Sequence, residues 1–144
     1  MFGYARQRAA SYQLEGQSLE LSEGYLEDMP FAADSFDCVV CTLTLCSVAS
    51  QQDALREVRR VLKPGGSFLF IEHVQDFTPG VRQKLQGMLD PLQQALADGC
   101  HLSRRTGNAI ECAGFAAVTM RQFELDGGGL VAPHIWGTAV MPVA

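Results

Sequence analysis

The sequence has no cluster of lysine and arginine residues, and its formal net charge at neutral pH is −5. A chain without a basic patch offers no face for nucleic-acid phosphates, so we expect no nucleic-acid partner. It has no uninterrupted apolar run long enough to cross a bilayer, so we expect no membrane segment in this chain. Arg6 and Arg8 near the start are not followed by an apolar segment, and a secretory signal is not expected either.

Motifs that mark several common active sites are also missing. The chain has no Gly-x-Ser-x-Gly sequence, which argues against the nucleophile of a serine hydrolase. It has neither Gly-x-Gly-x-x-Gly nor a phosphate-binding loop, which weakens a dinucleotide-binding interpretation. Internal repeats and low-complexity tracts are absent. At 144 residues, the chain has the length of one domain with a sizeable core.

Cysteine usage points to a reducing environment. The five cysteines are an odd number in apolar segments, which predicts reduced thiols in a cytosol-like compartment. Cys38 and Cys41 form a Cys-x-x-Cys pair, but on a strand they would point to opposite faces about 10 Å apart. Neither one metal ion nor a disulfide bridges that separation, so we interpret both as packing residues and predict no metal site. Cys46 and Cys100 are likewise interpreted as small buried hydrophobic residues.

The most distinctive segment is the nearly unbroken apolar run from Phe36 to Cys46. A run without alternation predicts a strand buried on both faces, as in a parallel sheet covered by helices. A helix is predicted next, because apolar residues from Ala54 to Leu62 recur at helical spacing and Ser50 with Asp53 resembles a capping box. A Lys-Pro-Gly-Gly sequence ends this helix before a second buried strand at residues 67–72. The strand–helix–strand order predicts a right-handed parallel βαβ unit.

The remaining segments predict further elements at the two ends of the chain. Pro91 lies inside the longest of them, so a kink or break is expected near Asp90. The last two strands are expected to form an antiparallel pair at the edge of an otherwise parallel α/β sheet. The predicted elements are a helix within residues 1–12, a short strand at 18–23, helices at 79–97 and 103–113, and strands at 115–125 and 134–140.

Ligands of parallel α/β sheets bind beyond the carboxyl ends of the strands. In this chain the strand ends Cys41-Thr42-Leu43 and Glu72-His73 would lie at one edge, together with the loop Leu26-Glu27-Asp28-Met29. Glu27 and Asp28 are compatible with solvated loop acids and equally with residues that bind a nucleoside or a cationic ligand. Spacing alone leaves both interpretations open.

Several segments resemble the class I S-adenosylmethionine-dependent methyltransferases, in particular the methyltransferase type 11 domain. They are Glu27 to Phe31, Asp34 to Val40 and Leu55 to Gly66. Four more segments look like the thiol methyltransferase branch, long known only as methyltransferase-like proteins: Cys41 to Val48, Glu72 to Val74, Asp98 to Cys100 and Pro133 to Ile135. The resemblance implies S-adenosyl-L-methionine as cofactor. It also implies a Rossmann-like sheet that is mostly parallel, with an antiparallel C-terminal strand.

One departure from the family pattern concerns the cofactor site. In the family, the first strand ends in a Gly-rich loop at the methionine part of the cofactor, and the second ends in an acid that holds the ribose hydroxyls. Neither feature is found in this sequence, so residues 1–144 are expected to form the C-terminal two-thirds of the fold, without its first two strands. The segment from Phe36 to Cys46 would then be the fourth strand, with a neighbour missing and an apolar edge exposed.

The resemblance also assigns candidate site residues. His73 and Asp98 are candidates for orienting the acceptor or removing its proton. A structural role fits His73 equally well and is favoured for Asp98 and His134. The candidates for cofactor contact are Leu26, Glu27, Asp28 and Met29, with the first two at the adenine, and Cys41, Thr42 and Leu43 beside the methionine or methyl region.

We therefore expect methyl transfer from S-adenosylmethionine to a small-molecule acceptor, possibly a thiol by analogy with that branch. Transfer from a sulfonium needs positioning more than an acid–base pair, and a thiolate is already a strong nucleophile. The acceptor segments at residues 75–101 and 127–133 are apolar, which predicts a hydrophobic acceptor. The alternatives are a non-catalytic fragment or pseudoenzyme of the same fold, and a nucleotide-binding oxidoreductase, which the missing fingerprint makes the weakest of the three.

Overall fold

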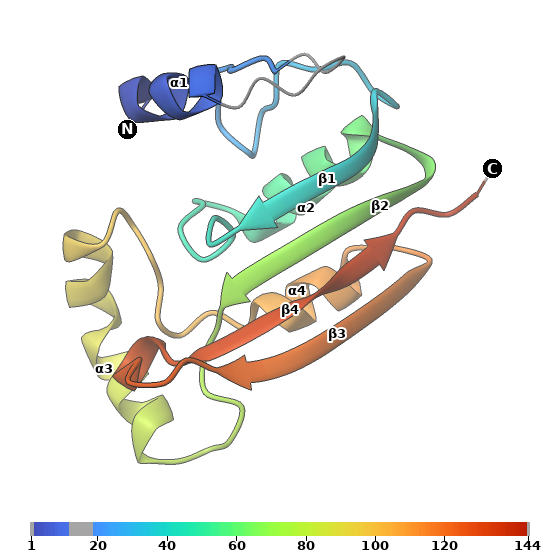
Figure 1. Cartoon of the computed structure of the whole chain (residues 1–144). Coiled ribbons are helices and arrows are strands. Elements are labelled where there is room, and N and C mark those ends of the chain that lie inside the picture. The colour runs from blue at the N-terminus through green and yellow to red at the C-terminus, as the bar shows by residue number, and fades with distance from the viewer. Residues whose placement is uncertain (1, 12–18, 144) are drawn as a thin grey trace.

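The structure, a computed structural model, describes residues 2–11 and 19–143 (Figure 1). The predicted N-terminal helix is present as α1, Phe2–Ser11. The central elements are β1, Phe36–Thr42, helix α2, Gln51–Val61, and β2, Leu62–His73. The C-terminal elements are α3, Val81–Leu96, α4, Thr106–Cys112, β3, Ala117–Glu124, the short 3-10 helix η1, Gly129–Val131, and β4, Pro133–Val140.

The strands form one mixed sheet in the order β1-β2-β4-β3. β1 and β2 are parallel and α2 connects them, so the predicted βαβ unit is confirmed. β4 runs antiparallel to both β2 and β3, which confirms the antiparallel C-terminal pair. The expectation of a mostly parallel sheet is not met in the described residues. Because β4 is inserted between β2 and β3, only the β1–β2 pairing is parallel.

Local sequence signals explain α2 well. The Ser50 hydroxyl accepts a hydrogen bond from the Asp53 amide at 3.2 Å, so one half of the expected capping box is present. Leu55 and Val58 are buried, as the helical spacing of the apolar residues predicts. The chain then passes directly into β2, and Gly65 adopts φ +75°, a conformation that side-chain-bearing residues rarely adopt.

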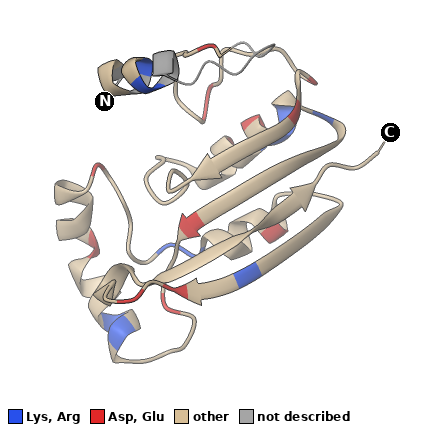
Figure 2. Ribbon diagram, viewed as in Figure 1, with Lys and Arg blue, Asp and Glu red and all other residues tan. Residues whose placement is uncertain are grey.

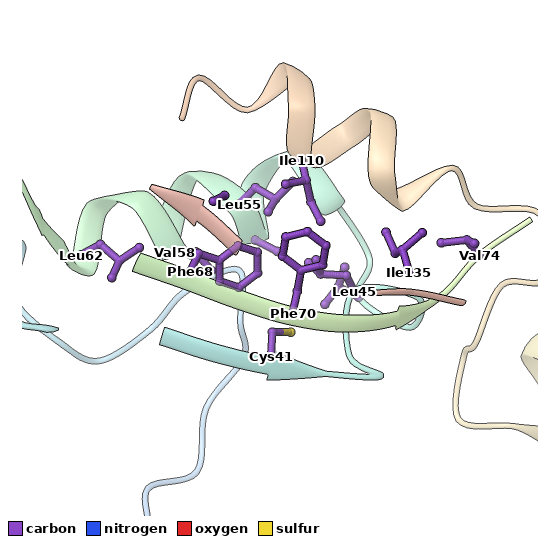
Figure 3. Packing of buried hydrophobic residues seen from close by; sticks show 13 residues of the cluster. Cys41, Leu45, Leu55, Val58, Leu62, Phe68, Phe70, Val74, Ile110 and Ile135 are labelled. Carbon is purple, nitrogen blue, oxygen red and sulfur yellow. The ribbon is translucent and has the colours of Figure 1, made fainter. Parts of the chain in front are cut away.

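The core lies between one face of the sheet and the helices α2 and α4. Figure 3 shows Phe68 and Phe70 of β2 pointing toward Leu55 of α2 and Ile110 of α4. The two phenylalanine rings lie 5.5 Å apart between centroids. Gly137 of β4 faces Phe70, because a Cβ at Gly137 would lie 2.8 Å from that ring and would overlap a backbone oxygen of β3. The absence of a side chain at this position lets the aromatic ring lie against the strand.

The opposite face of the sheet is open, so the expectation of strands buried on both faces is wrong. α2 and α4 both pack on the face that carries the phenylalanines, and in the described part of the chain β1 pairs only with β2. This agrees with the expected loss of a neighbouring strand beside β1. We call this surface the open face, defined by four apolar residues that remain substantially exposed: Val40 (70 %), Leu69 (39 %), Ile71 (44 %) and Trp136 (48 %).

The predicted end of the first strand is confirmed, whereas one short strand prediction is wrong. β1 ends at Thr42, within the expected strand end Cys41-Thr42-Leu43, and the rest of the apolar run is not strand because Leu43 adopts φ +52° and the chain turns there. Residues 19–23 form no strand, and Ser18 lies outside the described residues. Alternation alone did not predict a pairing partner for that segment.

Helix α3 continues through Pro91 without a break, contrary to expectation. Pro91 and Gly87, whose carbonyl loses its helical partner, both lie on the exposed side of the helix, where water can replace the missing hydrogen bond. The apolar stripe that predicted this helix is mostly exposed, at Val81, Leu85, Met88, Leu92 and Leu96. The side chain that α3 buries is polar, that of Gln86.

Charged residues lie on separate elements instead of on one strand or helix, as Figure 2 shows for the described residues. In the described part of the chain, no helix has the length and apolarity that a membrane crossing requires.

Candidate functional site

The loops at the carboxyl ends of β1 and β2 form what we call the carboxyl edge. Glu72, near the end of β2, is fully buried and organises it. Its carboxylate accepts hydrogen bonds from the amides of Thr44 at 3.0 Å, Leu45 at 3.1 Å and Cys46 at 3.2 Å. Sequence reasoning named Glu72 as a strand end and missed this role. The available signal was an acid within an apolar strand, because a buried carboxylate requires several donors.

The last residues of β1 point to different sides of the sheet. Cys41 is buried in the core, and its thiol lies 3.3 Å from a Glu72 carboxylate oxygen. Burial, reinforced by the charge of Glu72, raises the pKa of Cys41 to about 12, so this thiol stays protonated at neutral pH. Thr42 and Leu43 are exposed. The positive φ of Leu43 is a strained conformation of the kind that clusters at functional sites.

The loop from Leu26 to Met29 is held against α2. The Met29 amide donates to Glu57 at 3.0 Å, and the Arg60 guanidinium donates to the Met29 carbonyl at 3.0 Å. Arg60 also pairs with Glu57, and that hydrogen bond is the main reason why the pKa of Glu57 falls to about 2. Leu26 and Met29 pack against the edge of the core as a result.

The two acids of this loop have different surroundings. The Glu27 carboxylate accepts from the Ala49 amide at 2.7 Å and from the Ser50 amide at 3.4 Å, just before α2 begins. Asp28 is exposed, and its amide donates to the Tyr25 carbonyl at 3.1 Å to close a tight turn. Glu27 therefore positions the start of α2, whereas the Asp28 side chain points toward solvent.

A cavity of about 250 Å³ connects this loop with the carboxyl edge. Leu26 and Met29 meet Thr44 there, whereas Cys41, Thr42 and Leu43 do not line the cavity. Ligand pockets usually have about 300–1,000 Å³, so this cavity is large enough for only part of a nucleoside-sized molecule. Its walls are Ser22, Glu23, Gly24, Tyr25, Leu26, Met29, Pro30, Phe31 and Thr44.

The apolar and aromatic part of the cavity wall would suit a flat ring such as the adenine of S-adenosylmethionine. The lining residues do not supply the full set of groups that would hold the ribose and methionine parts of the cofactor. They do not include a Gly-rich loop, and Glu23 is the acid among them.

His73 is buried at the end of β2, with 3 % of its surface exposed. Its Nδ1 lies 3.8 Å from the Cys100 sulfur, and its Nε2 is buried without a hydrogen-bond partner. Burial, together with the neighbouring His134, lowers the pKa of His73 to about 4. The imidazole is therefore neutral at pH 7 and is a weak base, which favours an orienting role over proton removal.

Asp98 lies in the turn that follows α3. Its side chain is exposed and its φ is +47°. The turn packs on the loop after β1, because the His101 amide donates to the Cys46 carbonyl at 2.9 Å. The structure thus brings the Asp98 turn to the carboxyl edge. Within that turn, Cys100 is the residue that reaches His73.

A second cavity, of about 310 Å³, lies beyond β2; residues within 75–83 of the predicted acceptor segments line it, whereas residues 127–133 do not. It has both polar walls, such as Gln75 and Arg105, and apolar walls, such as Phe77 and Met120. Gln86 supports it from α3, because its side chain accepts from the Asp76 amide at 2.7 Å. Sequence reasoning did not single out Gln86, whose burial depends on contacts with distant segments.

Comparison with known proteins shows which proteins the chain resembles. Residues 1–70 match the family described as "Methyltransferase domain". Over 116 residues, the chain is 46 % identical to thiol S-methyltransferase TMT1A of Homo sapiens, which covers 79 % of this chain and 48 % of that protein. The chain therefore resembles methyltransferases over most of its length. It spans about half the length of the thiol S-methyltransferases that it matches.

Solved structures support the methyltransferase fold at lower identity. A SAM-dependent methyltransferase from Methanosarcina mazei superposes with a TM-score of 0.68 at 18 % identity, over 97 % of this chain and 76 % of that one. The cyclase SpnF superposes with a TM-score of 0.66 at 17 % identity, over 99 % and 61 %. Because one of these proteins is described as a cyclase, the shared fold alone does not specify the reaction.

Proposed function

We propose that this chain contributes to methyl transfer from S-adenosylmethionine to a small-molecule acceptor, and that the acceptor is a thiol. The observation that carries the proposal is the 46 % identity to a thiol S-methyltransferase over 116 residues. The matched length includes the carboxyl-edge motifs that suggested the thiol branch. The match to the methyltransferase domain and the fold support the cofactor more strongly than the acceptor.

In the bound state, S-adenosylmethionine would supply an electrophilic methyl group on a sulfonium, and the neutral thioether would be a good leaving group. Leu26 and Met29 would hold the adenine side in their apolar cavity, and Glu27 would fix the adjoining start of α2. Thr42 and Leu43 would border the methionine side. Glu72 would keep the loop after β1 in place, which supports the orientation on which a displacement depends.

The acceptor side would need little acid–base chemistry. A free thiol has a pKa near 8.5, so a small fraction is already the nucleophilic thiolate at pH 7, roughly a few per cent. His73 would orient the acceptor as a neutral imidazole, and Asp98 would border the site from its turn. The exposed apolar stripe of α3 supports a hydrophobic acceptor, and the cavity beyond β2 offers both polar and apolar walls to it.

An isotope-transfer assay tests this proposal directly. The chain would be incubated with methyl-labelled S-adenosylmethionine and a panel of alkyl thiols, phenols and lipids, and the products would be identified by mass spectrometry. We expect label on the sulfur of a hydrophobic thiol and none on a phenol. Label that appears only on phenols or lipids would reject the thiol assignment but would still support methyl transfer to a small-molecule acceptor.

The alternative of a non-catalytic fragment makes a different prediction. It is motivated by the missing Gly-rich strand, and it predicts no product with any acceptor. Calorimetry with millimolar S-adenosylmethionine separates the possibilities, because a chain that gives neither binding heat nor a thermal shift cannot be catalytic by itself. Binding without turnover would instead indicate a pseudoenzyme.

A further inference from the structure

Two thiols and an imidazole from distant parts of the sequence meet at the carboxyl edge. The nearest ligand atoms of Cys46, His73 and Cys100 all lie within 4.8 Å of one another. Cys46 comes from the loop after β1, His73 from the end of β2, and Cys100 from the turn after α3. Cys46 and His73 are buried, and Cys100 is half-buried.

The ligand atoms of this cluster make only weak contacts with one another. The His73 nitrogen that faces a cluster thiol is Nδ1, whereas the other ring nitrogen, Nε2, is buried without a direct hydrogen-bond partner. At 3.8 Å, the Cys100 sulfur and His73 Nδ1 make a weak contact. Cys46 Sγ has a comparably weak contact with the Ser47 hydroxyl, at 3.6 Å. Three soft ligand atoms therefore face one another without a strong partner among them.

The backbone on both sides of the cluster is firmly held. The Cys46 amide donates to Glu72, and its carbonyl accepts from the His101 amide at 2.9 Å. The Cys100 amide donates to the Ala97 carbonyl, also at 2.9 Å. These contacts fix the backbone positions from which the two cysteine side chains approach each other.

We propose that Cys46, His73 and Cys100 bind a thiophilic divalent cation, with Zn²⁺ as the metal that this ligand set suits. Zinc lies about 2.3 Å from cysteine sulfur and about 2.0–2.1 Å from histidine nitrogen, so tetrahedral ligand atoms are roughly 3.5–3.8 Å apart. The cluster reaches this spacing with an inward movement of about 1 Å or less. Each thiol releases its proton to the buffer as its Zn–S bond forms, and a fourth position stays open.

This site goes beyond the proposed methyl transfer, which requires no metal. A bound cation would link the loop after β1 to the turn after α3, and so join two sides of the carboxyl edge. It would also be coordinated by His73, the residue that we propose to orient the acceptor. Zinc binding and methyl transfer are measured independently, so failure of one does not decide the other.

Cobalt substitution tests the site in the complete chain. The protein, kept reduced by a phosphine, would be titrated with Co²⁺ and followed by absorption, and Zn²⁺ would then displace the cobalt. We expect one Co²⁺ per chain, with thiolate-to-cobalt charge-transfer bands and the visible bands of tetrahedral cobalt. Cys46→Ser and Cys100→Ser should each weaken the charge-transfer bands and lower affinity at least tenfold.

Matched controls use the two exposed cysteines outside the cluster, Cys38 and Cys112. Cys38→Ser and Cys112→Ser should leave the cobalt spectrum unchanged. Absence of charge-transfer bands in the unsubstituted chain, or equal spectra for all four variants, would overturn the proposal.

Alkylation of the unsubstituted chain avoids any dependence on variant folding. Iodoacetamide labelling with and without Zn²⁺ would be read at each cysteine by mass spectrometry. We expect Zn²⁺ to slow labelling of Cys100 at least tenfold and to leave Cys112 unaffected. Equal labelling of Cys100 with and without Zn²⁺ would contradict the site.

Discussion

The packing of the core around Phe70 requires glycine at position 137, where a hydrogen atom takes the place of a side chain. Gly137 lies in β4 opposite Phe70 of β2, and the phenylalanine ring occupies the space that a side chain at Gly137 would fill. A Cβ would also overlap the Thr119 carbonyl oxygen of β3. Two neighbours, one on each adjacent strand, therefore exclude any larger residue, and the backbone on one side cannot move without disturbing the sheet ladder.

We predict that Gly137→Ala destabilises the fold by about 1–3 kcal/mol, the usual effect of overpacking a core. Urea unfolding monitored by circular dichroism measures the change. Gly87→Ala is the matched control, because Gly87 lies within α3 and a Cβ there meets nothing within 4 Å. The control should gain about 0.5–1 kcal/mol from the better helix propensity of alanine. Equal effects of the two substitutions would contradict the packing argument.

At the scale of elements, α2 does more than connect two parallel strands. Its outer face carries Glu57 and Arg60, which together hold the backbone of the loop at Met29 and Phe31. The cavity that we assign to the adenine side is built from this loop. The geometry of the candidate site thus depends on a helix whose own formation the sequence strongly favours.

The ion pair on α2 gives a pH dependence with a defined sign. The pKa of Glu57 is about 2 in the folded chain against an ordinary value of 4.5. The unfolded chain binds more protons between these values, so this contribution is complete above pH 4.5 and is lost as pH falls through 2. Glu57→Gln should lower stability by about 1–2 kcal/mol at pH 7 and reduce the loss seen between pH 4.5 and 2.

Acid titration of unfolding free energy, for both the unsubstituted chain and Glu57→Gln, measures this effect. Glu111→Gln, at an exposed position on α4, is the control and should behave like the unsubstituted chain. Parallel acid profiles for Glu57→Gln and the unsubstituted chain would exclude the ion pair as a source of stability.

The elements that sequence predicted best are those with local signals. The cap at Ser50 and the apolar spacing of α2 are contained within a dozen neighbouring residues, and they specify the helix without any other contact. The strand character of residues 36–42 was equally clear. Whether that strand would be covered on both faces depends on what packs against it, and an apolar run contains no information about its partner.

The candidate site was less accessible to sequence reasoning for a related reason. Cys38 and Cys41 lie in different environments, as local strand geometry predicts, but only the buried Cys41 is a packing residue because Cys38 is exposed. Cys46, His73 and Cys100 are far apart in sequence and meet only through the topology of the sheet. Burial of Glu72 beneath three amides is similarly a consequence of how two loops fold together.

At the scale of the whole molecule, the sheet is covered on one face and open on the other. Val40 and Ile71 lie on the open face next to a strand edge that has no partner among the described residues. Exposed apolar strands with a free edge are prone to pair with other chains. The isolated chain is therefore expected to self-associate through this side.

Replacing Val40 and Ile71 together by threonine should reduce self-association while it changes stability by less than about 1 kcal/mol, because neither side chain is buried. Sedimentation velocity over a range of concentrations measures the effect. The control is a double threonine substitution at Val81 and Met88, which are also apolar and exposed but lie on α3. If only the α3 substitutions reduced association, the chains would associate through the apolar stripe of α3 and not through the open face.

Trp136 gives this asymmetry an optical consequence. It is the sole tryptophan of the chain, and it is 48 % exposed on the open face, with the Arg121 guanidinium 5.9 Å from its ring. Its emission should therefore be red-shifted and readily quenched by iodide in the free chain. Any polypeptide that covers this side of the sheet would shift the emission to shorter wavelength, so the protein carries its own fluorescent reporter of whether its sheet is covered.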